Sequence, residues 1–195
     1  MSDVHCPARI IVARHGQAEY ETPEMNAAGG SLTALGRGQA RELGERLRSE
    51  RVAAVICSEL SRAVQTAEIA AAVLGLPVRV RERLHEFPAG DYLGRPYEHG
   101  FFDGMVRSWL AGDLDARVPS GESGRETADR VLAVLDSVAD EFRGETVLVV
   151  CHGGVILALW GAIAPGSPDA PDGDLVLNGS SYVLERDADG WRMVR

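Results

Sequence analysis

Two histidines stand in matching positions, each after a short apolar run and before a glycine. Arg14-His15-Gly16 follows the run at residues 10–13, and His152-Gly153-Gly154 follows the run at residues 147–150. Such runs predict buried strands, and in parallel α/β sheets ligands bind beyond the carboxyl ends of the strands. Glycine there lets the backbone turn and approach a ligand closely. A lone histidine at a strand end is more often structural, but the two matching contexts favour a shared site.

Arg62 is the third residue whose type and position could serve chemistry. It lies near the start of a segment predicted to be a helix, directly after another predicted strand. Helix N-termini favour negative charge by roughly 0.3–1 kcal/mol, so a cation is misplaced there unless an anion binds beside it. The alternative is that Arg62 pairs with Glu59 or Glu68 on a solvated helix face.

Arg14, His15, Arg62 and His152 would form a cationic cluster in a chain whose net charge is −9. The two arginines match the two charges of a phosphomonoester dianion, and attack by a neutral imidazole on phosphorus needs that compensation. The sequence contains no lysine, and all 20 of its Lys and Arg positions are arginine. This excludes a P-loop, a protein kinase and a Schiff-base enzyme.

The elements that must position these side chains alternate between strand and helix. This pattern predicts an α/β fold, a three-layer α/β/α sandwich with a mostly parallel central sheet, in one domain spanning residues 1–195. Thr33 is the expected N-cap of the first helix, with Leu35, Leu43 and Leu47 facing inward, and Gly75 is the expected C-cap of the second. Strands are expected at 10–13, 53–57, 78–80 and 146–150, helices at 33–51, 60–74, 122–142 and 155–163, and a terminal hairpin at 175–185 and 191–194.

The segment at residues 92–119 interrupts the alternation and is rich in aromatic residues. An aromatic insertion of this kind is typical of a lid over a ligand site. Equally, it is typical of a satellite cluster that packs a long connection onto the body. Five aromatic residues lie in it: Tyr92, Tyr97, Phe101, Phe102 and Trp109.

The composition narrows the class of protein. A pI near 5.0 argues against nucleic acid and anionic membranes as partners. No apolar run is long enough to span a bilayer, and the first nine residues lack an export signal. Three widely spaced cysteines suggest reduced thiols and a cytoplasmic location. We expect a small phosphorylated metabolite as ligand and no metal or other cofactor; a homodimer is left open.

The ordered motifs resemble the histidine phosphatase superfamily, the phosphoglycerate-mutase-like proteins. The similarity runs in family order over nearly the whole chain, from residue 9 to about 185. It is carried by Arg14-His15-Gly16, Leu32-Thr33-x-x-Gly36-x-x-Gln39-Ala40, Ser58-x-Leu60-x-Arg62-Ala63-x-Gln65-Thr66-Ala67, Leu84-x-Glu86 with Gly90 and Gly94, Pro119-x-Gly121-Glu122-Ser123 and His152-Gly153.

The resemblance implies a role for each matching residue. His15 would be the nucleophile that accepts the phosphoryl group, and Arg14, Arg62 and His152 would hold its oxygens. Glu86 would protonate the leaving alkoxide and later activate water. The alternative for Glu86 is a surface carboxylate.

The glycines after the two histidines, Gly16 and Gly153, would bring the backbone against the substrate. Glu122 is interpreted as a charge in the first turn of a helix rather than as the catalytic acid.

Two departures from the family pattern lie after the first motif, where Ala18 and Glu21 replace the usual threonine and asparagine. An acidic Glu21 would repel a phosphate, so this loop is expected to take a different path.

The sequence favours a metal-independent phosphatase for a small phosphomonoester. The chain is short, and its insertion holds only Arg95, Arg107 and Arg117 as cations, which is few for a mutase that retains a bisphosphorylated intermediate. A phosphoglycerate-type phosphomutase and a catalytically weak phosphate-binding protein are the alternatives.

Overall fold

A six-stranded mixed sheet forms the centre of the molecule. The computed structural model describes residues 7–26, 29–96, 100–171 and 176–194. The strand order is β5-β4-β6-β1-β7-β8, in which the first four strands are parallel and β7 and β8 are antiparallel to their neighbours. The strands are β1 (Ala8–Arg14), β4 (Val52–Cys57), β5 (Val78–Val80), β6 (Thr146–Cys151), β7 (Ser181–Asp187) and β8 (Gly190–Val194).

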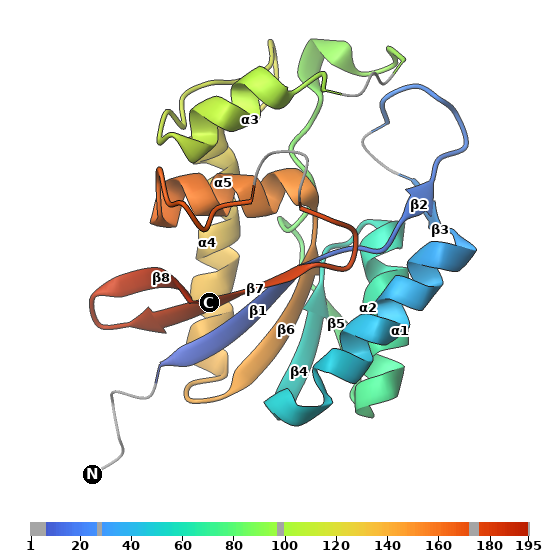
Figure 1. Cartoon of the computed structure of the whole chain (residues 1–195), viewed down its shortest axis with the longest axis vertical. Coiled ribbons are helices and arrows are strands. Elements are labelled where there is room, and N and C mark those ends of the chain that lie inside the picture. Colours follow the sequence, from blue (N-terminus) through green and yellow to red (C-terminus); the bar gives the residue numbers. More distant parts are fainter. Residues whose placement is uncertain (1–6, 27–28, 97–99, 172–175, 195) are drawn as a thin grey trace.

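Helices cover both faces of the sheet (Figure 1). On one face lie α1 (Ala34–Arg46) and α2 (Ser61–Leu74), and on the other lie α4 (Gly124–Glu141) and α5 (Gly153–Ile163). The smaller elements are β2 (Ala18–Glu19) paired with β3 (Ser31–Leu32), α3 (Asp103–Leu110), and the 3-10 turns at Arg48–Glu50 and Gly90–Tyr92. The predicted three-layer α/β/α architecture is confirmed.

Strand β1 shows why the core has two halves. Successive strand residues point to opposite faces, so Ile10 and Val12 pack toward α4 and α5 while Ile11 and Ala13 pack toward α1 and α2. All four are at most 2% exposed. Burial on both faces explains the unbroken apolar run that the sequence shows.

The predicted helix caps are present. The Thr33 side chain accepts a hydrogen bond from the Gly36 amide, and Gly75 ends α2 in the left-handed conformation at φ 72°.

The first helix differs from its prediction in two ways. It ends at Arg46 rather than at residue 51, because the chain tightens into a 3-10 turn and Arg51 then adopts a left-handed conformation. Leu35 is 57% exposed, so its predicted inward position is wrong. The buried face of α1 contains Gly36, Ala40 and Leu43 and continues to Leu47; Leu35 lies one residue off this i, i+4, i+7 pattern.

The segment at 92–119 holds a helix, α3, that the sequence analysis did not predict. Trp109 on α3 is fully buried and packs with Leu114 against Ala128 of α4 and Ala158 of α5. This burial confirms a packed satellite cluster, while a function as a lid stays a prediction. Tyr97 lies outside the described residues.

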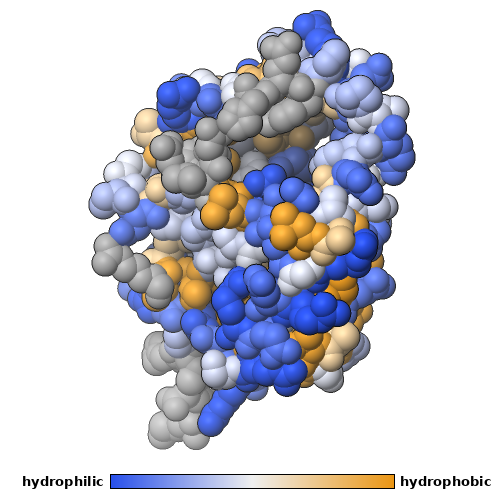
Figure 2. Space-filling model, turned by 45° about the vertical axis from the view of Figure 1, so that its right-hand side comes forward, coloured by the Kyte–Doolittle hydropathy of each residue, from blue (hydrophilic) through white to orange (hydrophobic). Residues whose placement is uncertain are grey.

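The terminal hairpin is confirmed, with its turn at residues 187–190. Its first strand begins at Ser181 rather than at residue 175, since residues 176–180 form a turn that leads into β7, and residue 175 lies outside the described part. None of the described helices is long and apolar enough to cross a membrane. On the face shown in Figure 2, hydrophobic residues form separate patches among hydrophilic ones.

Candidate active site

The register between β1 and β6 places the two histidines side by side. Arg14 is paired with Cys151, and the His15 amide donates to the Cys151 carbonyl over 3.0 Å. The ring centroids of His15 and His152 are 5.2 Å apart at an interplanar angle of 61°. Both side chains are buried at the carboxyl end of the parallel strands. The predicted meeting of the two imidazoles is therefore present in the structure.

The hydrogen bonds of His15 define its tautomer. Its Nδ1 lies 2.8 Å from the Gly16 carbonyl oxygen, which can only accept, so the ring proton belongs on Nδ1. Nε2 then carries the lone pair and accepts from Nε of Arg62 over 3.2 Å. Burial, reinforced by the charges of Arg62 and Arg14, lowers the pKa of His15 from 6.5 to about 3. The ring is neutral at physiological pH, the form that a nucleophilic imidazole requires.

Arg62 is a buried cation near the N-terminus of α2. It is 3% exposed, its Nη1 donates to the Gly29 carbonyl over 2.9 Å, and its guanidinium lies 5.6 Å from the centre of the Tyr20 ring. Within the described residues it forms no ion pair, so the alternative pairing with Glu59 or Glu68 is not what the structure shows. An unpaired buried charge is costly, and a bound anion would relieve that cost.

Arg14 is the second arginine of the site. Its Nη1 donates to the Val176 carbonyl, and its Nε is buried without a partner among the described residues. This Nε would lie 3.3 Å from a Cβ placed on Gly153, so the guanidinium lies against the first turn of α5. Two guanidiniums and a helix N-terminus thus converge, an arrangement that suits a phosphate dianion.

His152 is the N-cap residue of α5 and is fully buried. Its Nε2 lies 2.9 Å from Oγ of Ser58. Burial lowers the pKa of His152 well below its usual value, and the coupling to His15 and the charge of Arg62 act in the same direction. Both histidines of the pair are therefore neutral in the unliganded protein.

Glu86 also lies in this site. One carboxylate oxygen accepts from the Gly154 amide over 2.9 Å, and the other accepts from the Val155 and Phe87 amides, each over 3.1 Å. A Cβ on Gly154 would come within 2.7 Å of this carboxylate, so glycine is required here. The structure brings Glu86 to the start of α5, half-buried, rather than leaving it on the surface.

Glu122 does not lie in the first turn of α4, and that interpretation is wrong. Ser123 is the N-cap and forms a capping box with Glu126, which places Glu122 before the helix. Glu122 accepts instead from Nε of Arg130 over 3.0 Å, and Nη1 of Arg130 donates to the Arg83 carbonyl over 2.7 Å. The ion pair links the start of α4 to the segment that carries Glu86.

Three supporting residues were missed in the sequence. Thr66 Oγ1 accepts from the Gly16 amide over 3.0 Å, Asn178 Nδ2 donates to the His15 carbonyl over 3.0 Å, and Ser58 contacts His152. Ser58 and Thr66 lie within the motif around Arg62, which could have revealed them. No local signal marks Asn178.

Gly16 is required for packing. A Cβ there would come within 3.0 Å of the Gly36 Cα, and the Gly16 amide is occupied by Thr66. Its role toward a ligand stays a prediction, as does that of Gly153.

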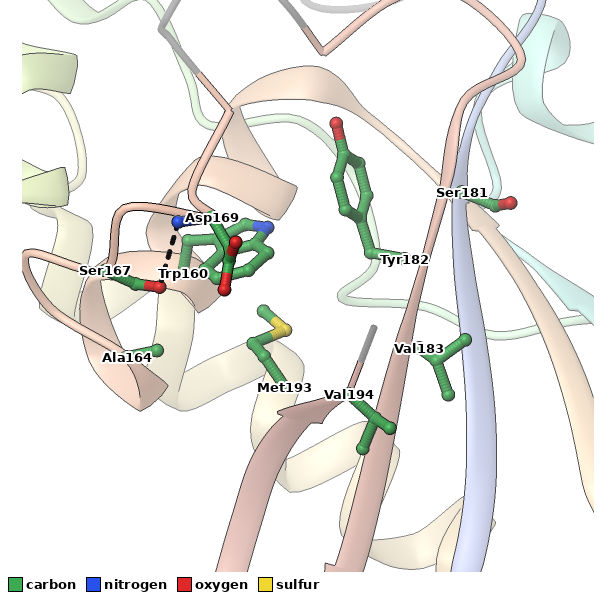
Figure 3. A pocket seen from close by; sticks show the side chains of 9 residues that line it. All are labelled: Trp160, Ala164, Ser167, Asp169, Ser181, Tyr182, Val183, Met193 and Val194. Atoms are coloured by element: carbon green, nitrogen blue, oxygen red, sulfur yellow. Dashed lines mark hydrogen bonds between the residues drawn. The ribbon is translucent and has the colours of Figure 1, made fainter.

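A depression of about 240 Å³ lies between the C-terminal half of α5 and the β7–β8 hairpin (Figure 3). Aromatic and apolar side chains of α5 and of the β7–β8 hairpin line it, among them Trp160, Tyr182 and Met193. No arginine or histidine lines it among the described residues, so it is separate from the cationic site. The described part of the chain also holds no group of three or more His, Cys, Asp or Glu side chains placed to bind a metal.

A match to a protein family model shows the family to which this chain belongs. The family model described as histidine phosphatase superfamily (branch 1) matches residues 10–195. This chain belongs to that superfamily. Probable phosphoglycerate mutase GpmB of Salmonella choleraesuis (strain SC-B67) is 35% identical over 150 residues, which cover 74% of this chain and 69% of that protein.

Solved structures of the superfamily resemble the whole chain. The mycobacterial glucosyl-3-phosphoglycerate phosphatase is 27% identical with a TM-score of 0.74, covering 96% of this chain and 97% of the other. Phosphoglycerate mutase from Bacillus anthracis str. Sterne is 21% identical with a TM-score of 0.77, covering 97% and 92%. The second likeness bears on the fold alone and confirms the phosphoglycerate-mutase-like architecture. Superfamily members are phosphatases or phosphomutases, which supports an enzyme of one of these two kinds.

Proposed function

We propose that the protein is a metal-independent phosphatase that hydrolyses a small phosphomonoester through a phosphohistidine at His15. One observation carries the proposal: a neutral imidazole with its lone pair on Nε2 accepts from Arg62, and the charge of Arg14 also acts on the ring, while neither guanidinium forms an ion pair within the described residues. The unsatisfied positive charge attracts the dianion, and the tautomer supplies the nucleophile.

Two displacements make up the reaction. The Nε2 lone pair of His15 forms a bond to phosphorus while the bond to the leaving oxygen breaks, and the Glu86 carboxyl protonates that oxygen. The Glu86 carboxylate then takes a proton from water, whose oxygen attacks phosphorus and breaks the P–N bond. Arg14, Arg62 and His152 hold the equatorial oxygens throughout.

Arg62 has a second role at the start of this sequence. In the unliganded protein its Nε–H group occupies the lone pair of His15. A bound phosphate offers better acceptors to a guanidinium than an imidazole nitrogen does. Substrate binding therefore turns Arg62 toward the phosphoryl oxygens and frees the nucleophile. Until a substrate arrives, the hydrogen bond from Arg62 protects the His15 lone pair.

Phosphomutase activity is the second candidate, favoured by the name of the GpmB relatives. A bisphosphorylated intermediate requires more positive charge than a monoester. Of the three cations in the segment at 92–119, Arg107 lies 3.6 Å from Asp103 and Arg117 lies 3.1 Å from Glu126, so acidic partners already neutralise both. Arg95 lies over the Tyr92 ring at 5.1 Å. This charge balance supports hydrolysis over transfer.

A catalytically weak phosphate-binding protein is the third candidate. Glu21 favours it, because this carboxylate would lie 2.9 Å from a Cβ on Gly29, whose carbonyl accepts from Arg62. An acidic side chain near this arginine would weaken anion binding.

A panel of phosphorylated metabolites tests the three candidates, with free phosphate as the readout. Hydrolysis by the wild type and none by His15→Ala would support the phosphatase. Conversion of 3-phosphoglycerate to its 2-isomer without free phosphate would favour the mutase. Equal rates from the two proteins, or no turnover by either, would favour the binding protein.

The same reasoning extends to partners and location. The ligand is a small phosphorylated metabolite rather than nucleic acid or a membrane, on the ground of the net charge of −9. The unpaired thiols of Cys57 and Cys151 support a cytoplasmic protein.

A further inference from the structure

His152 has one ring nitrogen with a partner and one without. Nε2 contacts Ser58 Oγ at 2.9 Å, while Nδ1 is buried and has no hydrogen-bond partner among the described residues. An N-cap side chain often accepts from amides of the first helical turn. Here the amides of Gly154 and Val155 are bonded to Glu86 instead. Nδ1 is therefore available to a ligand bound in the site.

Ser58 is the hydrogen-bond partner of the other ring nitrogen, Nε2. Its side chain is fully buried, and its Oγ accepts from the Leu60 amide over 3.2 Å. The hydroxyl hydrogen has two acceptors within reach, His152 Nε2 at 2.9 Å and Glu59 Oε2 at 3.4 Å. The contact with His152 is the shorter of the two, which favours a hydroxyl that donates to Nε2.

A neutral imidazole carries one N–H, so a ring that accepts at Nε2 must carry its proton at Nδ1. We propose that Ser58 is a positioning residue that fixes the His152 tautomer with the proton on Nδ1, and that this N–H donates to a phosphoryl oxygen of the substrate. The inference rests on the proposed function. It gives the two histidines opposite roles in one pocket, because His15 offers a lone pair at Nε2 and His152 offers a donor at Nδ1.

The opposite tautomer would not suit the site. With the proton on Nε2, the ring would donate to Ser58 and present a bare nitrogen to the same anion that Arg14 and Arg62 attract. Two electron-rich atoms would then face each other in a buried site, where polar repulsion is strong. Removing the Ser58 hydroxyl takes away the contact that selects the productive tautomer.

The test compares Ser58→Ala with Ser58→Thr, which keeps the hydroxyl, and with Ser180→Ala. Ser180 is a matched control because its Oγ is also buried but has no partner among the described residues. Long-range ¹⁵N–¹H spectra of the histidine rings report the tautomer, with His152→Asn used for assignment. Titration with orthovanadate measures anion binding, and kcat and KM are measured on an aryl phosphate.

We expect the wild-type spectrum to show the His152 proton on Nδ1, with and without orthovanadate. In Ser58→Ala the Nε2–H form becomes populated and orthovanadate binds about tenfold more weakly, the loss typical of an unsatisfied buried group. Ser58→Thr and Ser180→Ala retain the wild-type spectrum and affinity.

A His152 proton on Nε2 in the wild type would overturn the proposal, as would a Ser58→Ala protein that keeps the Nδ1 proton and full orthovanadate affinity. If Ser58→Ala fails to fold, the wild-type spectrum and Ser58→Thr still decide. Neither the tautomer nor orthovanadate binding depends on turnover. A protein that hydrolyses no phosphoester would contradict the proposed function and leave this result intact.

Discussion

The phosphate end of the sheet and the segment at 92–119 are held in place by different forces. Backbone register positions the first: β1 and β6 pair, and the two histidines at their ends meet at 5.2 Å. Aromatic packing positions the segment at 92–119, where the ring centre of Phe87 lies 5.2 Å from that of Phe102 and 5.4 Å from that of Trp109. The paired strands leave the two histidines little freedom to move. The aromatic packing leaves the outer edge of the segment at 92–119 exposed, at Phe101.

This difference assigns the chemical reaction to one region and the choice of substrate to the other. The reacting groups lie on strand ends and helix starts, so their geometry follows from the fold. The segment at 92–119 begins six residues after Glu86 and its inner half packs on α4 and α5, while Tyr92 and Phe101 contact each other at 4.6 Å on its outer side. We therefore expect substitutions at the phosphate end to change the rate of reaction, and substitutions in the segment to change which substrate is preferred.

The largest expected contrast is between two arginines. Arg62→Met lowers kcat/KM by about 10²–10³-fold, because it removes a donor to the developing charge. Arg117→Met, which removes a cation paired with Glu126, changes it by a few-fold at most. Steady-state kinetics on one aryl phosphate measure both. The free energy of unfolding is measured for both variants, since Arg62→Met relieves a buried charge that has no acidic partner in the described chain but also removes the hydrogen bonds to His15 and Gly29. A greater loss from Arg117→Met would reverse the comparison.

A pH effect on stability distinguishes the same two regions. His15 has a pKa of about 3 when folded and 6.5 when exposed, because burial disfavours its charged form. The unfolded chain thus binds a proton that the folded chain does not, and stability falls as the pH drops from 6.5 toward 3.

Between pH 7 and pH 4 this histidine accounts for a loss of about 3 kcal/mol. His15→Asn should remove that part of the loss, as measured by urea unfolding at both values. Phe101→Ala, in the other region, should retain all of it. An unchanged pH dependence in His15→Asn would mean that His15 is not held neutral.

Glu86→Gln tests whether this carboxylate transfers the proton. An alkyl leaving group needs protonation, so its hydrolysis falls by about 10²-fold or more. A nitrophenyl leaving group departs unaided, so kcat/KM for the nitrophenyl ester, which reports the first displacement alone, changes far less. The exposed Glu82→Gln is the matched control and leaves both rates unchanged. Equal losses of kcat/KM on the two substrates would show that Glu86 does not protonate the leaving group.

The smallest expected effect concerns selection. Phe101→Ala removes a partly exposed ring that contacts Tyr92, and it raises KM for a naphthyl phosphate about two- to tenfold, the range of one aromatic contact. KM for a small alkyl phosphate and both kcat values stay at the wild-type level. Leu35→Ala, an exposed apolar residue on α1, is the control. A change in kcat with no change in preference would place Phe101 among the groups that affect the rate.

The same division explains what the sequence could predict. Apolar runs with β-branched residues specify buried strands, and the register of β1 against β6 then places His15 beside His152. Local chemistry likewise specified the caps at Thr33 and Gly75.

Features that depend on distant contacts were not predictable in this way. The helix α3 owes its place to Trp109, whose cavity is built by α4 and α5. The position of Glu122 before α4 depends on Arg130, eight residues later, and on Ser123, which takes the cap. Asn178 reaches His15 across 163 positions of sequence.

The central claim is that His15 carries the phosphoryl group, and trapping the intermediate tests it most directly. The enzyme is mixed rapidly with a fast-turning aryl phosphate, quenched in denaturant at alkaline pH, and digested for peptide mass spectrometry. The account predicts an acid-labile phosphoryl group on the peptide that contains His15, formed faster than steady-state turnover and absent from His15→Asn. Turnover by the wild type without any phosphorylated His15, together with undiminished hydrolysis by His15→Asn, would contradict it.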